Sequence, residues 1–159
     1  MSSSKVTPAE WRNAVEGAAH ELATRALSLP GVTVETAVSA DRANSMIGAH
    51  IPLVGGGQAF DLSLVASPEG CRSLARAILC MAEGAALRDA EVADAVGEIV
   101  NMLAGSVKRR LSAQCADLVL GLPLFIHGYI EPSDRLQVIA LPTRFGAIET
   151  MVLIAGQRG

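Results

Sequence analysis

The chain has 159 residues and a formal net charge of −3, which predicts one domain large enough for a hydrophobic core. Half of the residues are hydrophobic and 18% are charged, a composition that excludes intrinsic disorder. The acidic balance, with one Trp, one Tyr and three Phe, argues against nucleic-acid binding, which needs basic patches and stacking aromatics. The low charge also indicates that a partner or a second copy covers part of the surface.

No apolar run approaches the roughly 18 residues of a membrane span, and the N-terminus has no apolar signal core, so we expect a cytoplasmic protein with no membrane contact. Cys71, Cys80 and Cys115 are odd in number and lie in apolar surroundings, which predicts buried free thiols. The three histidines share no ligand spacing with these cysteines. No metal site of the chain's own is therefore expected.

The first half of the chain predicts a helix followed by strands. Thr7-Pro8-Ala9-Glu10 forms a capping box that starts a helix over residues 8–29, and Pro30-Gly31 ends it. Apolar and polar residues then alternate over 32–65, which predicts two or three antiparallel strands with a glycine turn at 55–57. We expect residues 1–6 to be a flexible N-terminus and residues 7–159 to form a single domain.

The second half predicts two helices and then three strands. Ser67-Pro68 opens a helix that Gly84 closes, and another helix covers about 89–112. The strands are expected at 124–130, 136–141 and 148–155, joined by turns at 132–134 and 143–146. In the alternative of a structural protein that dimerises or joins an assembly, the nearly uncharged residues 148–155 would serve as a pairing edge. The fold class is α+β, with a mostly antiparallel sheet of about six strands and three helices.

The helix at 89–112 carries the most informative pattern. Its apolar stripe is Val92, Val96, Ile99, Val100, Leu103 and Val107, and its polar stripe is Glu91, Asp94, Glu98, Asn101, Gly105 and Lys108. A solvated polar face is the ordinary interpretation of such a stripe. However, glycine at position 105 destabilises the helix by roughly 1 kcal/mol relative to alanine, and Asn101 is a poor helix former. Both residues suit a face that another protein approaches closely.

This helix resembles the CheC/CheX/FliY family of chemotaxis phosphatases, whose signature is an acidic residue, Glu-x-x-Asn, Met/Ile-x-x-Gly and a Lys. Here the signature is Asp94, Glu98, Asn101, Met102, Gly105 and Lys108. The segment GLPLFIHG at 121–128 is similar to the family's Leu-Pro-x-x-x-x-Gly strand, and the element order matches over nearly the whole chain. A single copy of the signature favours the CheX-like branch, which is often dimeric.

The resemblance implies dephosphorylation of the aspartyl phosphate of a CheY-like response regulator. Asn101 would orient the attacking water and Glu98 would pair with the receiver's active-site Lys. From the residues themselves, we expect Gly105 to relieve crowding where the partner docks, Asp94 to serve docking or helix support, and Lys108 to contact the partner. The receiver would supply the Mg²⁺, and the chain would need no cofactor of its own. This chemistry suits the residues, because an acyl phosphate is already reactive and a carboxamide oxygen can accept a hydrogen bond from water.

Two other functions are compatible with the sequence. The first is a docking module that binds a receiver without dephosphorylating it, although the presence of both Glu98 and Asn101 favours catalysis. The second is a scaffold that dimerises or joins a larger assembly, such as a flagellar switch, through its apolar strands. A homodimer is compatible with phosphatase activity.

Overall fold

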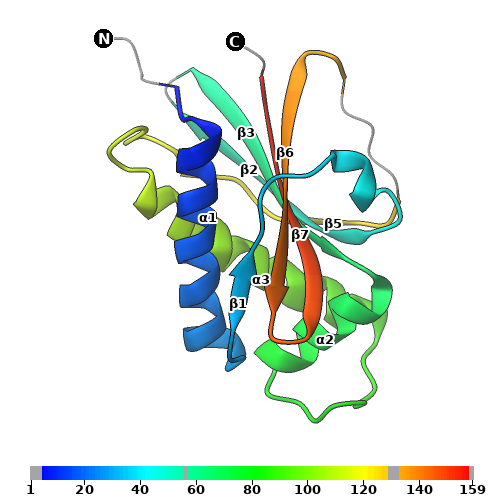
Figure 1. Ribbon diagram of the computed structural model, residues 1–159. Helices are drawn as coiled ribbons and strands as arrows, with labels where there is room; N and C mark the ends of the chain where they lie inside the picture. The colour runs from blue at the N-terminus through cyan, green and yellow to red at the C-terminus, as the bar shows by residue number, and fades with distance from the viewer. Residues whose placement is uncertain (1–4, 56, 129–132, 158–159) are drawn as a thin grey trace.

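A computed structural model of the chain describes residues 5–55, 57–128 and 133–157 (Figure 1). The helices are α1 (Pro8–Leu22), α2 (Pro68–Ile78) and α3 (Asp89–Arg110), with a π-helical segment η1 (Ala23–Leu27) and a 3₁₀ turn η2 (Ala40–Ala43). The strands are β1 (Val32–Val34), β2 (Ile47–Gly55), β3 (Gln58–Ala66), β4 (Val119–Leu120), β5 (Leu124–Ile126), β6 (Leu136–Phe145) and β7 (Ile148–Gln157). The described residues thus confirm an α+β fold with three α-helices.

The seven strands of the described chain form one sheet in which every pairing is antiparallel. Its order is β1-β6-β7-β3-β2-β4, and β5 also pairs with β2. β7 therefore lies between β6 and β3 at the centre of the sheet, and the prediction that residues 148–155 form a free edge is wrong. The physical reason is burial, because Val152 and Ile154 pack in the core.

The helices cover one face of the sheet. Side chains of α1, α2 and α3 share one core cluster with alternate residues of the central strands, among them Ile51, Leu62 and Val152. The other face carries a smaller cluster around Val65 and Met151, under the segment that contains η2. This two-layer arrangement leaves the outward side of α3 free of the sheet.

Two helices end earlier than the sequence predicts. α1 begins with the expected capping box, in which the Glu10 N–H donates to Thr7 Oγ1 at 3.2 Å, but helical structure ends at Leu27. α2 ends at Ile78, whereas the sequence predicts an end at Gly84. Beyond Ile78 the side chains have no core surface to cover, and Met81 is exposed. Cys80 there adopts a left-handed backbone with φ of 55°.

The strand boundaries differ where tertiary pairing decides them. β6 extends to Phe145, beyond the predicted end at residue 141, because β1 pairs with its last residues. The turn consequently lies at Gly146, with φ of 60°. β5 covers only Leu124–Ile126, and β4 is a short strand that the sequence pattern did not predict. The predicted turn residues Gly56 and Pro132, and the end of the strand predicted over 124–130, lie outside the described residues.

The cysteines and the chain start add two corrections. Cys71 and Cys115 are buried as predicted, but Cys80 is exposed because it follows the early end of α2. Burial raises the pKa of the Cys71 thiol to about 11. Residues 1–4 of the predicted flexible start lie outside the described part of the chain, while Val6 packs in the core. None of the described helices is long and apolar enough to cross a membrane.

Candidate functional site

The local sequence of α3 determines which side of the helix faces outward. The helix begins where the Arg88 N–H donates to the Glu91 carboxylate at 3.1 Å, and it continues for 22 residues. All members of the predicted apolar stripe are buried: Val92, Val96, Ile99, Val100, Leu103 and Val107. Because this stripe anchors α3 to the core, the polar residues between its members project from a rigid support.

The predicted site residues all lie on α3, with different exposure. Asp94 and Glu98 are exposed, whereas Asn101, Gly105 and Lys108 are half-buried. Asn101 is therefore only partly exposed, whereas its place on the polar stripe favours a side chain fully open to solvent. Within the described part of the chain, neither the Glu98 carboxylate nor the Asn101 carboxamide has a hydrogen-bonding partner. Their polar atoms are available to another molecule.

Asn101 is partly covered because it lines a groove between α1 and α3. The groove has a volume of about 370 Å³, and Asn101, Met102 and Gly105 form its α3 side. Leu22 of α1 and Leu120 of β4 also line it. The tertiary structure thus brings Asn101 and Gly105 to one concave surface, while Asp94, Glu98 and Lys108 do not line it.

Gly105 is not required by the internal packing of the chain. A Cβ atom built on Gly105 would lie 3.9 Å from Arg109 Nη1 and 4.0 Å from Leu120 Cδ1, which are ordinary van der Waals distances. A Cβ on Gly17 of α1, in contrast, would collide with the guanidinium of Arg110. The space above Gly105 is open to the groove, so any reason for a glycine there lies outside the described chain.

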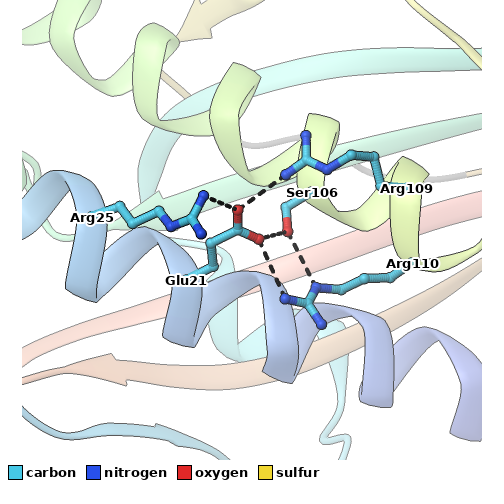
Figure 2. A network of polar contacts seen from close by, with 5 residues as sticks. All are labelled: Glu21, Arg25, Ser106, Arg109 and Arg110. Atoms are coloured by element: carbon cyan, nitrogen blue, oxygen red, sulfur yellow. Dashed lines mark hydrogen bonds and ion pairs between the residues drawn. The ribbon is translucent and has the colours of Figure 1, made fainter.

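A polar network beside this groove links α1 to α3 (Figure 2). The Ser106 hydroxyl donates to Glu21 Oε2 at 2.7 Å, and Arg110 reaches the same oxygen at 3.3 Å. Arg109 and Arg25 approach Glu21 Oε1 at 3.1 Å and 3.4 Å. The Ser106 hydrogen bond, with the nearby arginines, lowers the pKa of the Glu21 carboxyl. Glu21 therefore remains ionised between the two helices at neutral pH.

The sequence does not reveal this network, because its members are distant along the chain. Glu21 and Ser106 are separated by 85 positions, so only the packing of α1 on α3 brings them together. Ser106 itself is buried, at 3% exposure. In the sequence, nothing distinguishes it from any other small residue in a helix. The run of basic residues at the end of α3 was the only visible signal, and favourable interaction with the helix dipole explains such a run equally well.

A second polar cluster lies on the opposite face of the sheet. Ser63 Oγ is 2.5 Å from His50 Nδ1, and Asp61 Oδ2 is 3.4 Å from the same nitrogen. The cluster borders a cavity of about 560 Å³. A serine-hydrolase triad needs the serine and the aspartate on opposite ring nitrogens, so this arrangement does not form one.

Across residues 5–55, 57–128 and 133–157, no group of three or more His, Cys, Asp or Glu side chains is placed to hold a metal ion. The polar site on α3 consists instead of an amide, a carboxylate and a charged network. Such groups can orient a water molecule or bind a charged partner.

Comparison with known proteins identifies the family. The family described as "Chemotaxis phosphatase CheX" matches residues 47–142, which is more than half of the chain and includes all of α3. A search of the curated proteins found no match.

Solved structures share the fold along nearly the whole chain. The chemotaxis protein CheX from Vibrio vulnificus has a TM-score of 0.76 at 20% identity, covering 93% of this chain and 99% of that one. A CheC-like superfamily protein from Shewanella sp. PV-4 has a TM-score of 0.74 at 20% identity, with coverages of 94% and 98%. The CheX-CheY-BeF₃-Mg²⁺ complex from Borrelia burgdorferi gives 0.70 at 15% identity, with coverages of 98% and 100%. From the family match, this chain belongs to the CheX family of chemotaxis phosphatases.

Proposed function

We propose that this protein hydrolyses the aspartyl phosphate of a CheY-like response regulator. The observation that carries the proposal is the pair Glu98 and Asn101, which stand one turn apart on the outward side of α3 without partners among the described residues. Membership of the CheX family supports the reaction class. A CheX of the same fold, solved in complex with CheY, BeF₃ and Mg²⁺, supports the class of partner.

Asn101 acts on the attacking water. The water oxygen forms a bond to phosphorus while the bond between phosphorus and the acyl oxygen breaks, giving the receiver's free carboxylate, inorganic phosphate and a proton. The carboxylate is a good leaving group, so positioning of the water is the main requirement. The Asn101 carboxamide oxygen accepts a hydrogen bond from this water and directs it in line with the leaving oxygen. The receiver provides the Mg²⁺ that neutralises the phosphoryl charge.

Glu98 orients the complex. Its exposed carboxylate stands one turn before Asn101 and pairs with the lysine of the receiver's active site. This ion pair determines where the Asn101 carboxamide enters the receiver. Asp94, one further turn away, and Lys108 extend the contact along α3, and Gly105 leaves space for the partner's surface.

The test is the decay of a ³²P-labelled CheY-like receiver from the same cell, with the wild-type protein and with Asn101→Ala. We expect faster decay with the wild type and a loss of about 100-fold or more in the variant, the order found when a positioned polar group is removed from a reaction site. Asn13→Ala, which removes an exposed asparagine from α1, is the matched control and keeps full activity.

Other outcomes identify the alternative functions. Tight binding of the phosphorylated receiver with unchanged decay indicates a docking module without catalysis. Absence of binding to every receiver of the cell favours a scaffold role. If Asn101→Ala unfolds the protein, Asn101 is a structural residue and its assignment to the site is wrong.

A further inference from the structure

The groove beside Asn101 combines apolar walls with a charged rim. Ala18 and Leu22 of α1 line it but are buried in the core, so its exposed apolar surface comes mainly from Met102 of α3, which is 37% exposed. At the rim stand Arg25 and Arg109, with Glu21 between them (Figure 2). A surface of this kind binds an apolar side chain that is accompanied by a charge.

The charge of the rim is positive although the whole chain is acidic, at −3. Glu21 is one carboxylate among Arg25, Arg109 and Arg110, so the network keeps two net positive charges. Arg110 acts internally, because its Nε donates to Ser106 Oγ at 3.2 Å and its guanidinium fills the space that Gly17 leaves open.

Arg25 and Arg109 face solvent instead. Their side chains are 78% and 65% exposed. Each makes one hydrogen bond in the described structure, to Glu21 Oε1, and a guanidinium has five N–H donors. Glu21 thus restrains both guanidinium groups at the rim while most of their donors stay available for a partner.

The position of Arg109 relates this charge to the proposed reaction site. Its Nη1 lies 3.9 Å from where a Cβ of Gly105 would stand, so the guanidinium leans back toward the start of α3. Gly105 follows Asn101 by one helical turn, about 5.4 Å along the axis. A partner that Asn101 reaches therefore meets a positive charge directly beside the contact.

We propose that the groove between α1 and α3 docks an acidic segment of the phosphorylated receiver, with an apolar side chain of that segment packed on Met102. Arg25 and Arg109 are the residues that recognise its carboxylates. The proposal rests on the proposed function and extends the partner surface from α3 to α1. Charge complementarity supports this occupant, since the network at the rim keeps two net positive charges and an acidic segment carries the opposite sign.

A structural role for the same arginines makes a different prediction. Basic residues in the last turn of a helix stabilise it through the dipole, and Arg25 pairs with Glu21 across one turn of its own helix. If these were their only roles, neutral replacement would lower the unfolding free energy and leave receiver affinity unchanged. Affinity and its salt dependence therefore distinguish the two roles.

The first experiment measures binding of the Mg²⁺- and BeF₃-activated receiver by isothermal titration calorimetry at several salt concentrations. Arg25→Gln and Arg109→Gln are each expected to weaken binding by about fivefold and to reduce its dependence on salt. A separate assay measures dephosphorylation of the phosphorylated receiver at saturating concentration. There, kcat of both variants should differ from that of the wild type by less than about twofold, because these residues do not touch the reacting atoms. Arg144→Gln is the control, since Arg144 is also exposed and also pairs with a glutamate at 3.1 Å.

The second experiment fills the groove. Gly105→Leu places a side chain in the open space, and leucine favours helix over glycine, so the fold is retained or stabilised while binding falls about tenfold or more. Gly97→Ala is the control, because a Cβ there meets Pro123 at an ordinary 3.7 Å. If Gly105→Leu fails to fold by circular dichroism, Gly105→Ala is used, with higher stability and weaker binding expected.

The outcomes separate this proposal from the proposed function. If the arginine and Gly105 variants bind the activated receiver as tightly as the wild type, the groove proposal is wrong, and an activity that depends on Asn101 still stands. If affinity falls only in proportion to lost stability, the arginines are structural and the proposal is again wrong. If the wild type binds no receiver, both proposals fail.

Discussion

Two stretches of α3, residues 94–101 (here the first half) and residues 105–110 (the second half), differ in how their polar side chains are partnered. In the first half, Asp94, Glu98 and Asn101 have no side-chain hydrogen bond to the described residues. In the second half, Ser106 and Arg109 are bound to Glu21 of α1. Polar groups without internal partners contribute little to stability and are available for binding. Partnered groups fix the relative position of the helices and thereby shape the groove.

The difference also predicts how each half responds to mutation. Changes in the first half should alter activity and leave the unfolding free energy nearly constant, because water already solvates these side chains. In the second half, removal of the buried Ser106 hydroxyl should alter stability, since it is hydrogen-bonded to a carboxylate. The exposed Arg109 differs from Ser106, because its proposed role is in binding the receiver.

Asn101→Asp is expected to have the largest effect. The substitution keeps the size of the side chain but removes the amide hydrogens and adds a negative charge facing the receiver's phosphoryl group. Turnover should fall about 100-fold or more, as with removal of a positioned catalytic group, while the urea midpoint is unchanged. Single-turnover decay of the phosphorylated receiver measures it, and near-normal decay would remove Asn101 from the reaction.

Glu98→Gln is expected to have the next effect. Loss of the charge weakens the pairing with the receiver's lysine, so KM should rise about tenfold and kcat should fall less. Asp94→Asn serves as comparison, because Asp94 lies on the same exposed side and is assigned only a docking contact. Equal effects of the two substitutions would show that Glu98 contributes general charge and no specific pairing.

Ser106→Ala tests the second half of the helix. The substitution removes a buried donor to the Glu21 carboxylate, and the unfolding free energy should fall by about 1 to 3 kcal/mol. Thermal and urea unfolding measure the change, with Ser73→Ala in α2 as the control for an ordinary helical serine. An unchanged midpoint would mean that the network with Glu21 does not hold α1 to α3.

Acidification should act on the same network with a smaller effect. The pKa of Glu21 is lowered in the folded protein from its usual 4.5, first by the Ser106 hydrogen bond. Its contribution to stability is therefore complete above about pH 4.5 and is lost as the pH falls through the lowered value. Glu21→Gln should make unfolding less sensitive to acid over this range, as measured by urea midpoints between pH 3 and pH 6.

Glu69→Gln is the matched control for that experiment. Hydrogen bonds from Arg72 and then Arg76 lower the pKa of Glu69, so this substitution should reduce acid sensitivity in the same direction. It lies in α2, away from the groove, and should leave receiver binding unchanged. If both variants keep the full acid dependence, the lowered pKa values do not govern stability at low pH.

Much of the fold and the proposed site residues follow from local sequence. The Thr7 capping box starts α1 because its two hydrogen bonds join residues three positions apart. The spacing of apolar residues in α3 determined which side is buried, and hence that Glu98 and Asn101 project outward. These features depend on near neighbours in the chain, which is why the sequence alone determined them.

Only the tertiary structure decided the features that join distant segments. The Glu21 network needs α1 beside α3, and the groove that partly covers Asn101 exists only between those helices. The central position of β7 depends on pairing with both β6 and β3. Its uncharged sequence is equally compatible with an edge strand that pairs with another chain. Local periodicity specifies which face of an element is apolar, but not which neighbour covers it. That choice is made by the packing of the whole core.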